Sequence, residues 1–308
     1  MKKRKESVWS LQICVSILLL MSSGFLPLAA ANVQVTIVQS NDNSFYDQTR
    51  QGLKHQLTAD FQLSVISADT ITTQEKRLRT SDIIITLGID AALKISGKFT
   101  TRKIISAYIT LRQQQQYQVE LEDHTVVLLN QPLSRYFAFT SLMLQPESIG
   151  IINQKKLILD KRQKKTLSQF NLNLRQYELQ AEANPISTVR SLLRHNDAHL
   201  MLPEENIYNR DTLKGILLTS YRSRKPVISY SPSHVKAGAL ASIFSSPSDI
   251  GSHLASIVGR LINKPNQVKP AVEFAQYFSV AVNKRVAHAL SIKLPDEAQL
   301  ISELKAMQ

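Results

Sequence analysis

Short apolar runs alternate with longer amphipathic segments along this chain, and this alternation constrains the fold more than any other feature. Five of the runs have the length of a strand: residues 33–38, 62–66, 83–87, 103–107 and 126–129. Helical patterns separate most of them, and Tyr46, Leu53 and Leu57 share one helix face after the first run. Such alternation predicts a parallel sheet with helices on both faces.

A second series of strand-like runs follows, at residues 149–152, 172–178, 198–202, 227–230 and 239–244. Two series of this size exceed one small sheet, so we predict an α/β protein made of two Rossmann-like lobes. Open parallel sheets bind ligands beyond the carboxyl ends of their strands. Two such sheets that face each other would place a ligand in the cleft between the lobes.

The first 31 residues have the parts of a secretory signal peptide. Residues 2–5 are basic, an apolar run spans residues 13–21, and Ala29, Ala30 and Ala31 match the small-x-small pattern of signal peptidase. The alternative is a membrane anchor, but the apolar run is far shorter than the ~20 residues that a span needs. We therefore expect cleavage after Ala31 and a periplasmic protein.

Cleavage would remove Cys14, which is the only cysteine, and would lower the net charge from +13 to +10 because the signal carries a net charge of +3. A basic chain suggests nucleic-acid binding, but export, the absence of Trp after residue 9 and the scatter of Lys and Arg argue against it. We interpret the densest cluster as a solvated helix face, and contact with acidic phospholipid headgroups or an acidic partner is the alternative. This cluster comprises Lys155, Lys156, Lys161, Arg162, Lys164 and Lys165.

Several segments resemble a known family. They read NQPLSR at 130–135, LQPESIGI at 144–151, LPE at 202–204, IYNRDTLKGILLTSYR at 207–222, KPVISY at 225–230, VKAGALA at 235–241, FSVAVN at 278–283 and IKLP at 292–295. As a set they resemble ABC-transporter substrate-binding proteins related to tryptophan/tyrosine-binding members. The resemblance implies the type I periplasmic binding-protein fold, in which the chain crosses three times between the lobes.

The resemblance places these crossings near residues 129–131, 241–244 and 265–270. The first lobe would then comprise residues 32–129 plus 243–265, and the second lobe residues 130–242 plus 266–308. Residues 247–263 would form a helix that returns to the first lobe. Their sequence fits, because Ser246 and Pro247 open the segment and Ile250, Leu254 and Leu261 lie on its apolar stripe.

Polar residues at strand ends of the first lobe are candidates for ligand contacts: Asn41, Asp42, Tyr46, Thr86, Gly88, Asp90 and Tyr108. The family uses the loop that holds Asn41 and Asp42, although a helix cap by Asn or Ser explains this loop equally well. Relatives usually have a small or hydroxyl residue at Asp90, where free helix N–H groups can hold a ligand carboxylate. Asp90 would either cap these donors, which we favour, or contact an amine or hydroxyl group of the ligand.

The second-lobe candidates are Gln131, Arg135, Asn153, Glu204, Tyr208, Tyr230, Ser231 and Lys236. We expect Arg135 and Glu204 to be exposed in the open cleft; the alternative is that Arg135 anchors the crossing. Tyr108 and Tyr230 could stack on a planar ligand, but filling of the core is favoured for both.

Motifs of catalysis are missing from the sequence, which has no phosphate-binding glycine loop, no G-x-S-x-G and no H-E-x-x-H. His195 and His199 are four residues apart but straddle a predicted helix–strand junction, so we do not expect them to bind a metal. We therefore expect a monomeric protein that is not an enzyme and has no cofactor, metal or nucleic-acid partner.

The resemblance implies a periplasmic solute-binding protein that captures a small organic ligand, such as an amino-acid-like compound, for an ABC permease in the inner membrane. The alternative is a sensor of the same fold, which reports ligand binding to a membrane receptor without transport.

Export yields the first testable prediction. Mass spectrometry of the periplasmic fraction should find a mature chain that begins at Asn32, since the small residues Ala29 and Ala31 directly precede the scissile bond in the small-x-small pattern. An intact chain held in the inner membrane would contradict the assignment of a cleavable signal.

Overall fold

The computed structural model describes residues 33–57, 61–180, 183–204, 206–264, 267 and 269–307. The predicted signal peptide lies outside these residues. Within the described ranges, no helix is both long enough and apolar enough to span a membrane.

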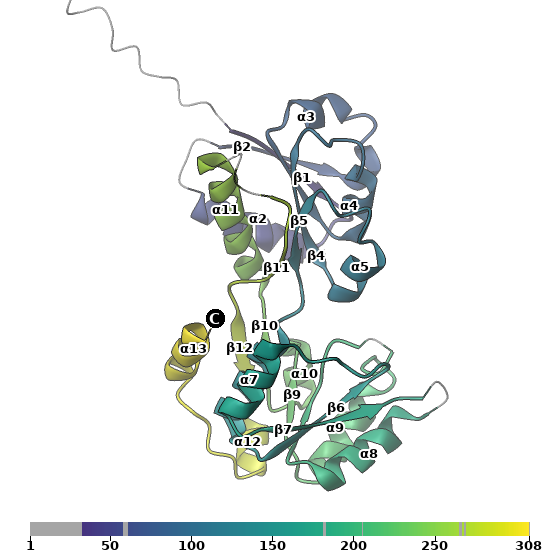
Figure 1. Ribbon diagram of the computed structural model, residues 1–308, viewed down its shortest axis with the longest axis vertical. Coiled ribbons are helices and arrows are strands. Elements are labelled where there is room, and N and C mark those ends of the chain that lie inside the picture. Colours follow the sequence, from purple (N-terminus) through teal and green to yellow (C-terminus); the bar gives the residue numbers. More distant parts are fainter. Residues whose placement is uncertain are drawn as a thin grey trace, which may run out of the picture.

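The described strands form two separate sheets, one in each of two lobes that lie one above the other in Figure 1. The first sheet has the order β11-β5-β4-β3-β1-β2, and all its pairings are parallel. Its strands are β1 (Val33–Gln39), β2 (Phe61–Ser67), β3 (Ile83–Leu87), β4 (Lys103–Ile109), β5 (His124–Leu128) and β11 (Val272–Phe274). The parallel α/β lobe predicted from the alternating pattern is confirmed.

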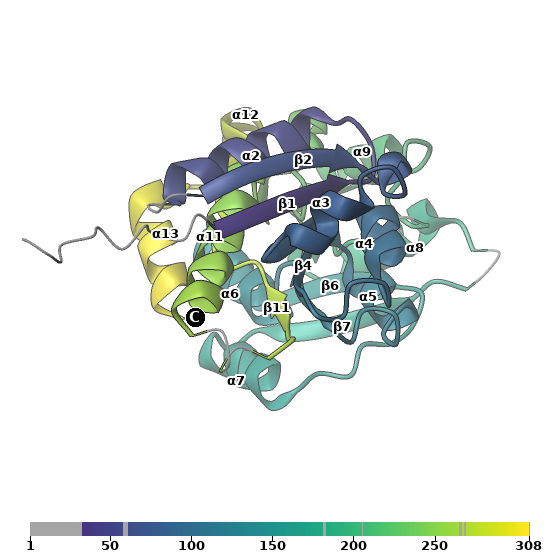
Figure 2. The ribbon, with the colours of Figure 1, turned by 90° about the horizontal axis from the view of Figure 1, so that it is seen from above.

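Helices cover both faces of this sheet (Figure 2). The helices α2 (Ser44–Gln56) and α11 (Pro247–Asn263) pack on the face that carries Val35, Ile37 and Ile85. The opposite face packs α3 (Glu75–Thr80) and α4 (Ile89–Ile95), while α5 (Leu111–Gln116) and the 3-10 turn η1 (Ala68–Thr70) lie along its strand ends. The predicted apolar stripe of α11 is buried, so this helix does return to the first lobe.

The second sheet has the order β12-β10-β9-β8-β6-β7, and only its edge strand β12 is antiparallel. Its strands are β6 (Ser148–Asn153), β7 (Asn173–Glu178), β8 (Ala198–Leu200), β9 (Val227–Ser229), β10 (Ala241–Phe244) and β12 (Ser279–Val282). One face packs α6 (Leu133–Leu144), α7 (Lys161–Gln169), α12 (Lys284–Ala289) and α13 (Glu297–Ala306). The other packs α8 (Pro185–His195), α9 (Leu213–Arg222) and α10 (Pro232–Ala237).

Three crossings join the lobes, at residues 129–132, 245–246 and 275–278. The second and third lie later than predicted. Residues 241–244 form β10 of the second sheet, and β11 pairs with β5 through Val272 and Val126, which keeps it in the first sheet. The sequence did not reveal β11 because it is a three-residue edge strand with a Glu at its centre.

The topology makes the carboxyl edges of the two sheets face each other. The carboxyl ends of β5 and β11 lead directly into crossings to the second lobe, and every strand of the first sheet is parallel to them. The carboxyl end of β10 likewise leads into α11, and β6 to β9 are parallel to β10. Loops that follow strands in one lobe therefore face those of the other lobe.

The contact between α2 and α11 depends on two glycines. A Cβ atom at Gly251 would lie 2.3 Å from the carbonyl oxygen of Thr49 and 2.7 Å from the amide nitrogen of Leu53. A Cβ at Gly52 would lie 2.9 Å from the carbonyl oxygen of Ser248. The two helix backbones therefore touch, and this close contact attaches α11 to a lobe whose other helices precede it by more than 100 residues.

Substitution of Gly251 tests this contact. Gly251→Ala should lower the free energy of unfolding by about 1–3 kcal/mol, because the added methyl group meets rigid backbone. Gly259→Ala is the matched control in the same helix, since no described atom outside the adjoining backbone of that helix lies within 4 Å of its added Cβ. It should be neutral or stabilising by about 0.5–1 kcal/mol in urea unfolding; equal effects of the two variants would contradict the close packing.

Candidate functional site

The carboxyl edge of the first sheet holds a compact group around Gly88. The φ angle of Gly88 is 95°, and a Cβ atom there would lie 2.5 Å from Ser40 Oγ and 2.6 Å from Tyr46 Oη. Ser40 Oγ accepts a 3.0 Å hydrogen bond from the backbone N–H of Ala91 at the start of α4. Gly88 thus lets the end of β3 approach the loop that follows β1.

Asp90 lies exposed in the first turn of α4, next to this group. The favoured role of Asp90 as a helix cap is wrong: Gly88 occupies the N-cap position, and Ser40 accepts the N–H of Ala91. Burial raises the pKa of Tyr46, and the nearby charge of Asp90 raises it further. The Asp90 carboxylate is therefore close to the Tyr46 hydroxyl and remains open to solvent.

Tyr108 packs edge-on against Tyr46, with ring centroids 5.1 Å apart. Its φ of 61° is unusual for a residue other than glycine, and it coincides with an irregularity in the pairing of β4 with β5. The hydroxyl lies 2.5 Å from Thr49 Oγ1, and burial raises the pKa of Tyr108 to about 12. Both tyrosine rings thus stand at the carboxyl edge of the sheet.

The other first-lobe candidates divide between surface and core. Asn41 and Asp42 are exposed, and Asp42 accepts a hydrogen bond from Gln39. The cap of α2 is Asn43, one residue further on. Thr86, in contrast, is fully buried and donates to Ser106, whose Oγ lies 2.7 Å from His124 Nδ1. The hydroxyl of Thr86 is therefore engaged inside the sheet and does not face the cleft in this conformation.

Asn153 ends β6 at the facing edge of the second sheet. It is 1% exposed, and neither atom of its side-chain amide has a hydrogen-bond partner among the described residues. Because strand side chains alternate, Asn153 shares a face with Ile149 and Ile151, which belong to the core beneath α6. A buried amide without partners costs free energy unless water or a ligand satisfies it.

Glu204 follows β8 and is half-buried. Burial raises its pKa, and the positive charge of Arg112 opposes this increase. Arg112 belongs to α5 of the first lobe, so a charge from each lobe acts across the cleft. The sequence analysis did not select Arg112, although it lies just after Thr110, which caps α5 beyond the end of β4.

The structure places four further second-lobe candidates in different environments. The hydroxyl of Tyr208 is buried 3.0 Å from His199 Nε2, so it belongs to the core. Ser231 caps α10, and Lys236 is exposed in the last turn of that helix, which leads away from the strand end. Tyr230 directly follows β9, is half-buried and packs edge-on against His234 at 4.8 Å. Of these four, Tyr230 is the best placed at the edge.

Gln131 and Arg135 tie the three crossings together. Gln131 Nε2 donates to Ser245 Oγ at 2.7 Å, and Ser245 Oγ donates to the carbonyl of Tyr277 at 2.7 Å. Arg135 donates to Gln131 Oε1 and, at 2.9 Å, to the carbonyl of Ala275. The expectation that Arg135 is exposed is wrong: it is 8% exposed, and its guanidinium lies 4.8 Å from the centroid of the Phe278 ring.

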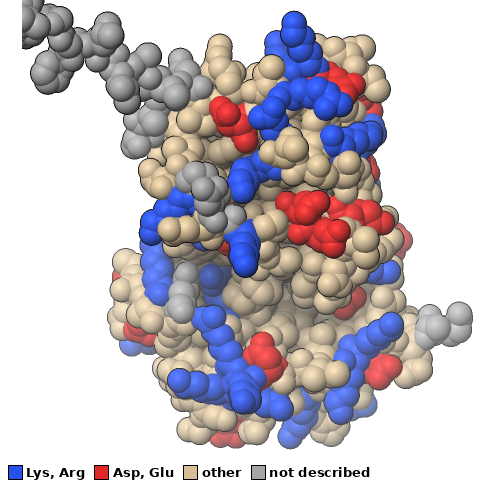
Figure 3. Space-filling view, turned by 45° about the horizontal axis from the view of Figure 1, so that its top comes forward, with Lys and Arg blue, Asp and Glu red and all other residues tan. Residues whose placement is uncertain are grey.

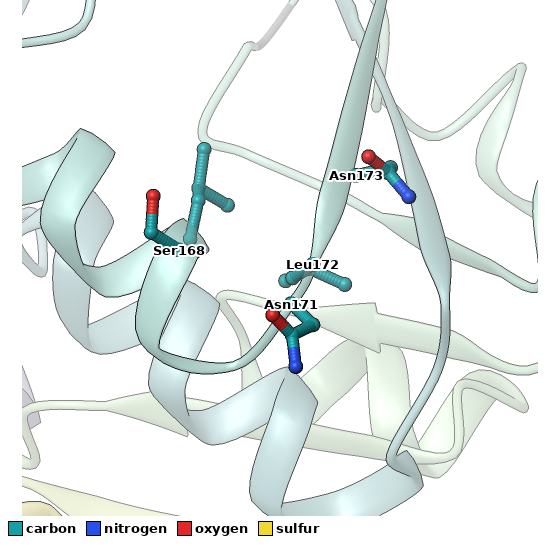
Figure 4. Close-up of a pocket in the computed structure, with 5 residues that line it drawn as sticks. Ser168, Asn171, Leu172 and Asn173 are labelled. Atoms are coloured by element: carbon teal, nitrogen blue, oxygen red, sulfur yellow. The ribbon is translucent and has the colours of Figure 1, made fainter.

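The surface is hollowed between the two lobes (Figure 3). Two other depressions lie on the second lobe alone. One, of about 380 Å³, surrounds the turn from α7 to β7, where Ser168, Asn171 and Asn173 gather (Figure 4). The second, of about 890 Å³, lies between the end of α6 and residues 290–295. Neither contains a candidate residue, because both lie at the amino ends of strands.

His195 and His199 lie on different elements, α8 and β8, as the sequence indicated. In the described part of the chain, no group of three or more His, Cys, Asp or Glu residues is arranged to hold a metal ion.

Two parallel-sheet lobes joined by three crossings, with facing carboxyl edges, define the two-lobed periplasmic binding-protein fold. The model of the family described as "ABC transporter substrate binding protein" matches residues 148–303, which is half of the chain, and the protein belongs to this family. This confirms the resemblance noted in the sequence. A search of curated proteins found no match.

Solved structures share the fold at low sequence identity. The ligand-free, open structure of a substrate-binding protein with adhesive properties from Clostridium difficile has a TM-score of 0.62 and 14% identity, and the match covers 86% of this chain and 97% of that one. A conserved domain protein from Vibrio cholerae has a TM-score of 0.52 and 18% identity, and the match covers 88% of this chain and 98% of that one. A Streptococcus pneumoniae protein in complex with L-Trp has a TM-score of 0.51 and 16% identity, and the match covers 89% of this chain and 98% of that one.

Truncation of Arg135 tests the crossing network. Arg135→Ala should lower the free energy of unfolding by about 1–3 kcal/mol, because it leaves Gln131 Oε1 and the Ala275 carbonyl without their buried donor. Lys236→Ala, which removes an exposed cation, should change it by less than about 0.5 kcal/mol. Thermal unfolding of the ligand-free protein measures both; an unchanged melting point for Arg135→Ala would contradict its structural role.

Proposed function

We propose that this protein binds a small organic ligand with an amino or hydroxyl group in the cleft between its lobes and delivers it to an ABC permease, without chemical change. The observation that carries the proposal is the buried side chain of Asn153. Its amide offers two donors and an acceptor at the edge that faces the group around Tyr46 and Asp90, and no described residue uses them.

The charges of the cleft favour a ligand with hydrogen-bond donors. Asp90 and Glu204 contribute carboxylates from opposite lobes, and both accept from amines or hydroxyls when ionised. An anion at the start of α4 would meet the charge of Asp90 and an Ala91 N–H that Ser40 already occupies. Arg112 supplies a cation for a ligand carboxylate, so an amino-acid-like ligand would find partners for both of its charges.

Three aromatic rings limit the shape of the ligand. Tyr108 is half-buried at the first edge, where it packs against the buried Tyr46, and Tyr230 is half-buried at the second edge. Half-buried rings at both edges suit a planar ligand group, and the protein that was crystallised with L-Trp shares this fold. Membership of the ABC transporter substrate-binding family supports delivery to a permease, and the predicted signal peptide supports a periplasmic location.

A thermal-shift screen against amines, amino acids and polyols tests the proposal. A ligand at ~100 times its Kd should stabilise the protein by about 2.7 kcal/mol, which is roughly 5–10 °C in Tm for a chain of this size. Asn153→Leu should reduce this shift while it preserves or raises the ligand-free Tm, because it removes a buried amide that lacks partners. Asp90→Asn and Glu204→Gln should reduce the shift as well.

The matched controls are Asp123→Asn and Glu122→Gln, which make the same changes just before β5, at the opposite edge of the first sheet. Both should retain the full ligand shift. X-ray scattering should also show a smaller radius of gyration with ligand, since contacts to both lobes select a closed form. If all three cleft variants kept the full ligand-induced increase in Tm, the ligand would have to bind outside the proposed site.

A further inference from the structure

The segment after β6 exposes an aliphatic side chain among cations. Ile158 is 97% exposed, the highest value among the large hydrophobic residues of the described chain. Lys155 and Lys156 precede it, and α7 follows with Lys161, Arg162, Lys164 and Lys165, all of them exposed. We define residues 155–165 as the basic segment.

The residues on either side of Ile158 fix its backbone and keep its side chain exposed. Leu157 and Leu159 pack against the core of the second lobe, so the side chain between them points away from it. Gln176 of β7 accepts from the Leu157 N–H at 2.8 Å and donates to the Leu157 carbonyl at 3.1 Å. A capping box between Asp160 and Gln163 then fixes the start of α7. Ile158 is therefore presented on a fixed backbone.

The charge of the five lysines of the basic segment is largely uncompensated. The segment contains a single acidic residue, Asp160, which caps α7, and its Arg162 donates a hydrogen bond to the Met307 carbonyl. Across the described residues, no carboxylate lies within 4.0 Å of the side-chain nitrogen of any of the five lysines. Single exposed apolar residues are common on protein surfaces. Ile158 differs from them because it is the most exposed large hydrophobic residue of the described chain and lies within a run of lysines.

We propose that the basic segment docks the second lobe onto an anionic phospholipid bilayer, with the lysines at the headgroups and Ile158 inserted at the interface. Clustered cations and an apolar side chain that can enter the interface are the two components of binding to an anionic membrane surface. Lysine acts as a point charge that suits a diffuse field of headgroups, whereas recognition of individual carboxylates on a protein favours Arg. The proposal goes beyond ligand capture and is independent of the cleft.

Vesicle binding tests the proposal. The protein is purified in the form in which cells accumulate it, with its N-terminus established by mass spectrometry. It should co-sediment with vesicles of phosphatidylcholine containing about 30% phosphatidylglycerol but not with phosphatidylcholine alone, and about 0.5 M salt should release it. Lys164→Glu/Lys165→Glu should lower the affinity roughly 20-fold or more, and Ile158→Ser roughly 5- to 10-fold.

Two controls on the first lobe match these variants. Lys76→Glu/Arg77→Glu changes the net charge equally on the exposed surface of α3, and Val119→Ser removes a side chain that is 75% exposed. Both should bind vesicles like the parent protein. An equal loss of vesicle affinity in the charge control would overturn the proposal, because binding would then depend on net charge and not on the basic segment. Failure of the parent protein to bind anionic vesicles would overturn the proposal too, and would favour an acidic protein as the partner of this surface.

Discussion

The network that joins the three crossings is the constraint on which the rest of the structure depends. Gln131, Ser245 and Arg135 connect side chains and carbonyls from all three crossings; Gln131 and Arg135 are buried, and Ser245 is half-buried. Ser279 adds a further connection, since its Oγ donates to Asp249 Oδ2 at the start of α11 at 2.7 Å. Any rotation of one lobe against the other must occur around this region, because these crossings are the covalent connections between the two sheets.

Several buried polar side chains have hydrogen-bond partners within the protein, and we interpret these side chains as structural. Thr86, Ser106 and His124 bond to one another inside the first sheet, and burial lowers the pKa of His124 to about 4, which keeps it neutral at pH 7. His199 and Tyr208 form a comparable pair in the second lobe. Asn153 and Asp90 differ from these groups, because nothing in the described chain uses their hydrogen-bonding capacity. This contrast, more than position at a strand end, is the reason we propose Asn153 and Asp90 as ligand contacts.

Periodic features of the sequence predicted most of the fold. The five strands of each series and the apolar stripe of α11 follow from local periodicity, and the structure has all of them. The edge strands β11 and β12 were both missed; β11 carries no such pattern, because it has only three residues with a central Glu, and β12 has only four residues. For the proposed site, the sequence indicated the strand ends that face each other in the structure but could not rank the residues on them. Thr86, Tyr208 and Arg135 looked as available as Asn153 and Glu204.

The sequence by itself determined the two α/β lobes, the five strands of each series and the amphipathic helix at residues 247–263, because periodicity and capping act between residues that are close along the chain. The return of this helix to the first lobe was implied by the family resemblance. Only the tertiary structure decided which polar side chains are committed to the fold. Arg135 bonds to a carbonyl 140 residues away, and Gln131 to a hydroxyl 114 residues away. A polar group is structural or free according to whether such a distant partner reaches it, and this depends on how the two sheets and their crossings pack together.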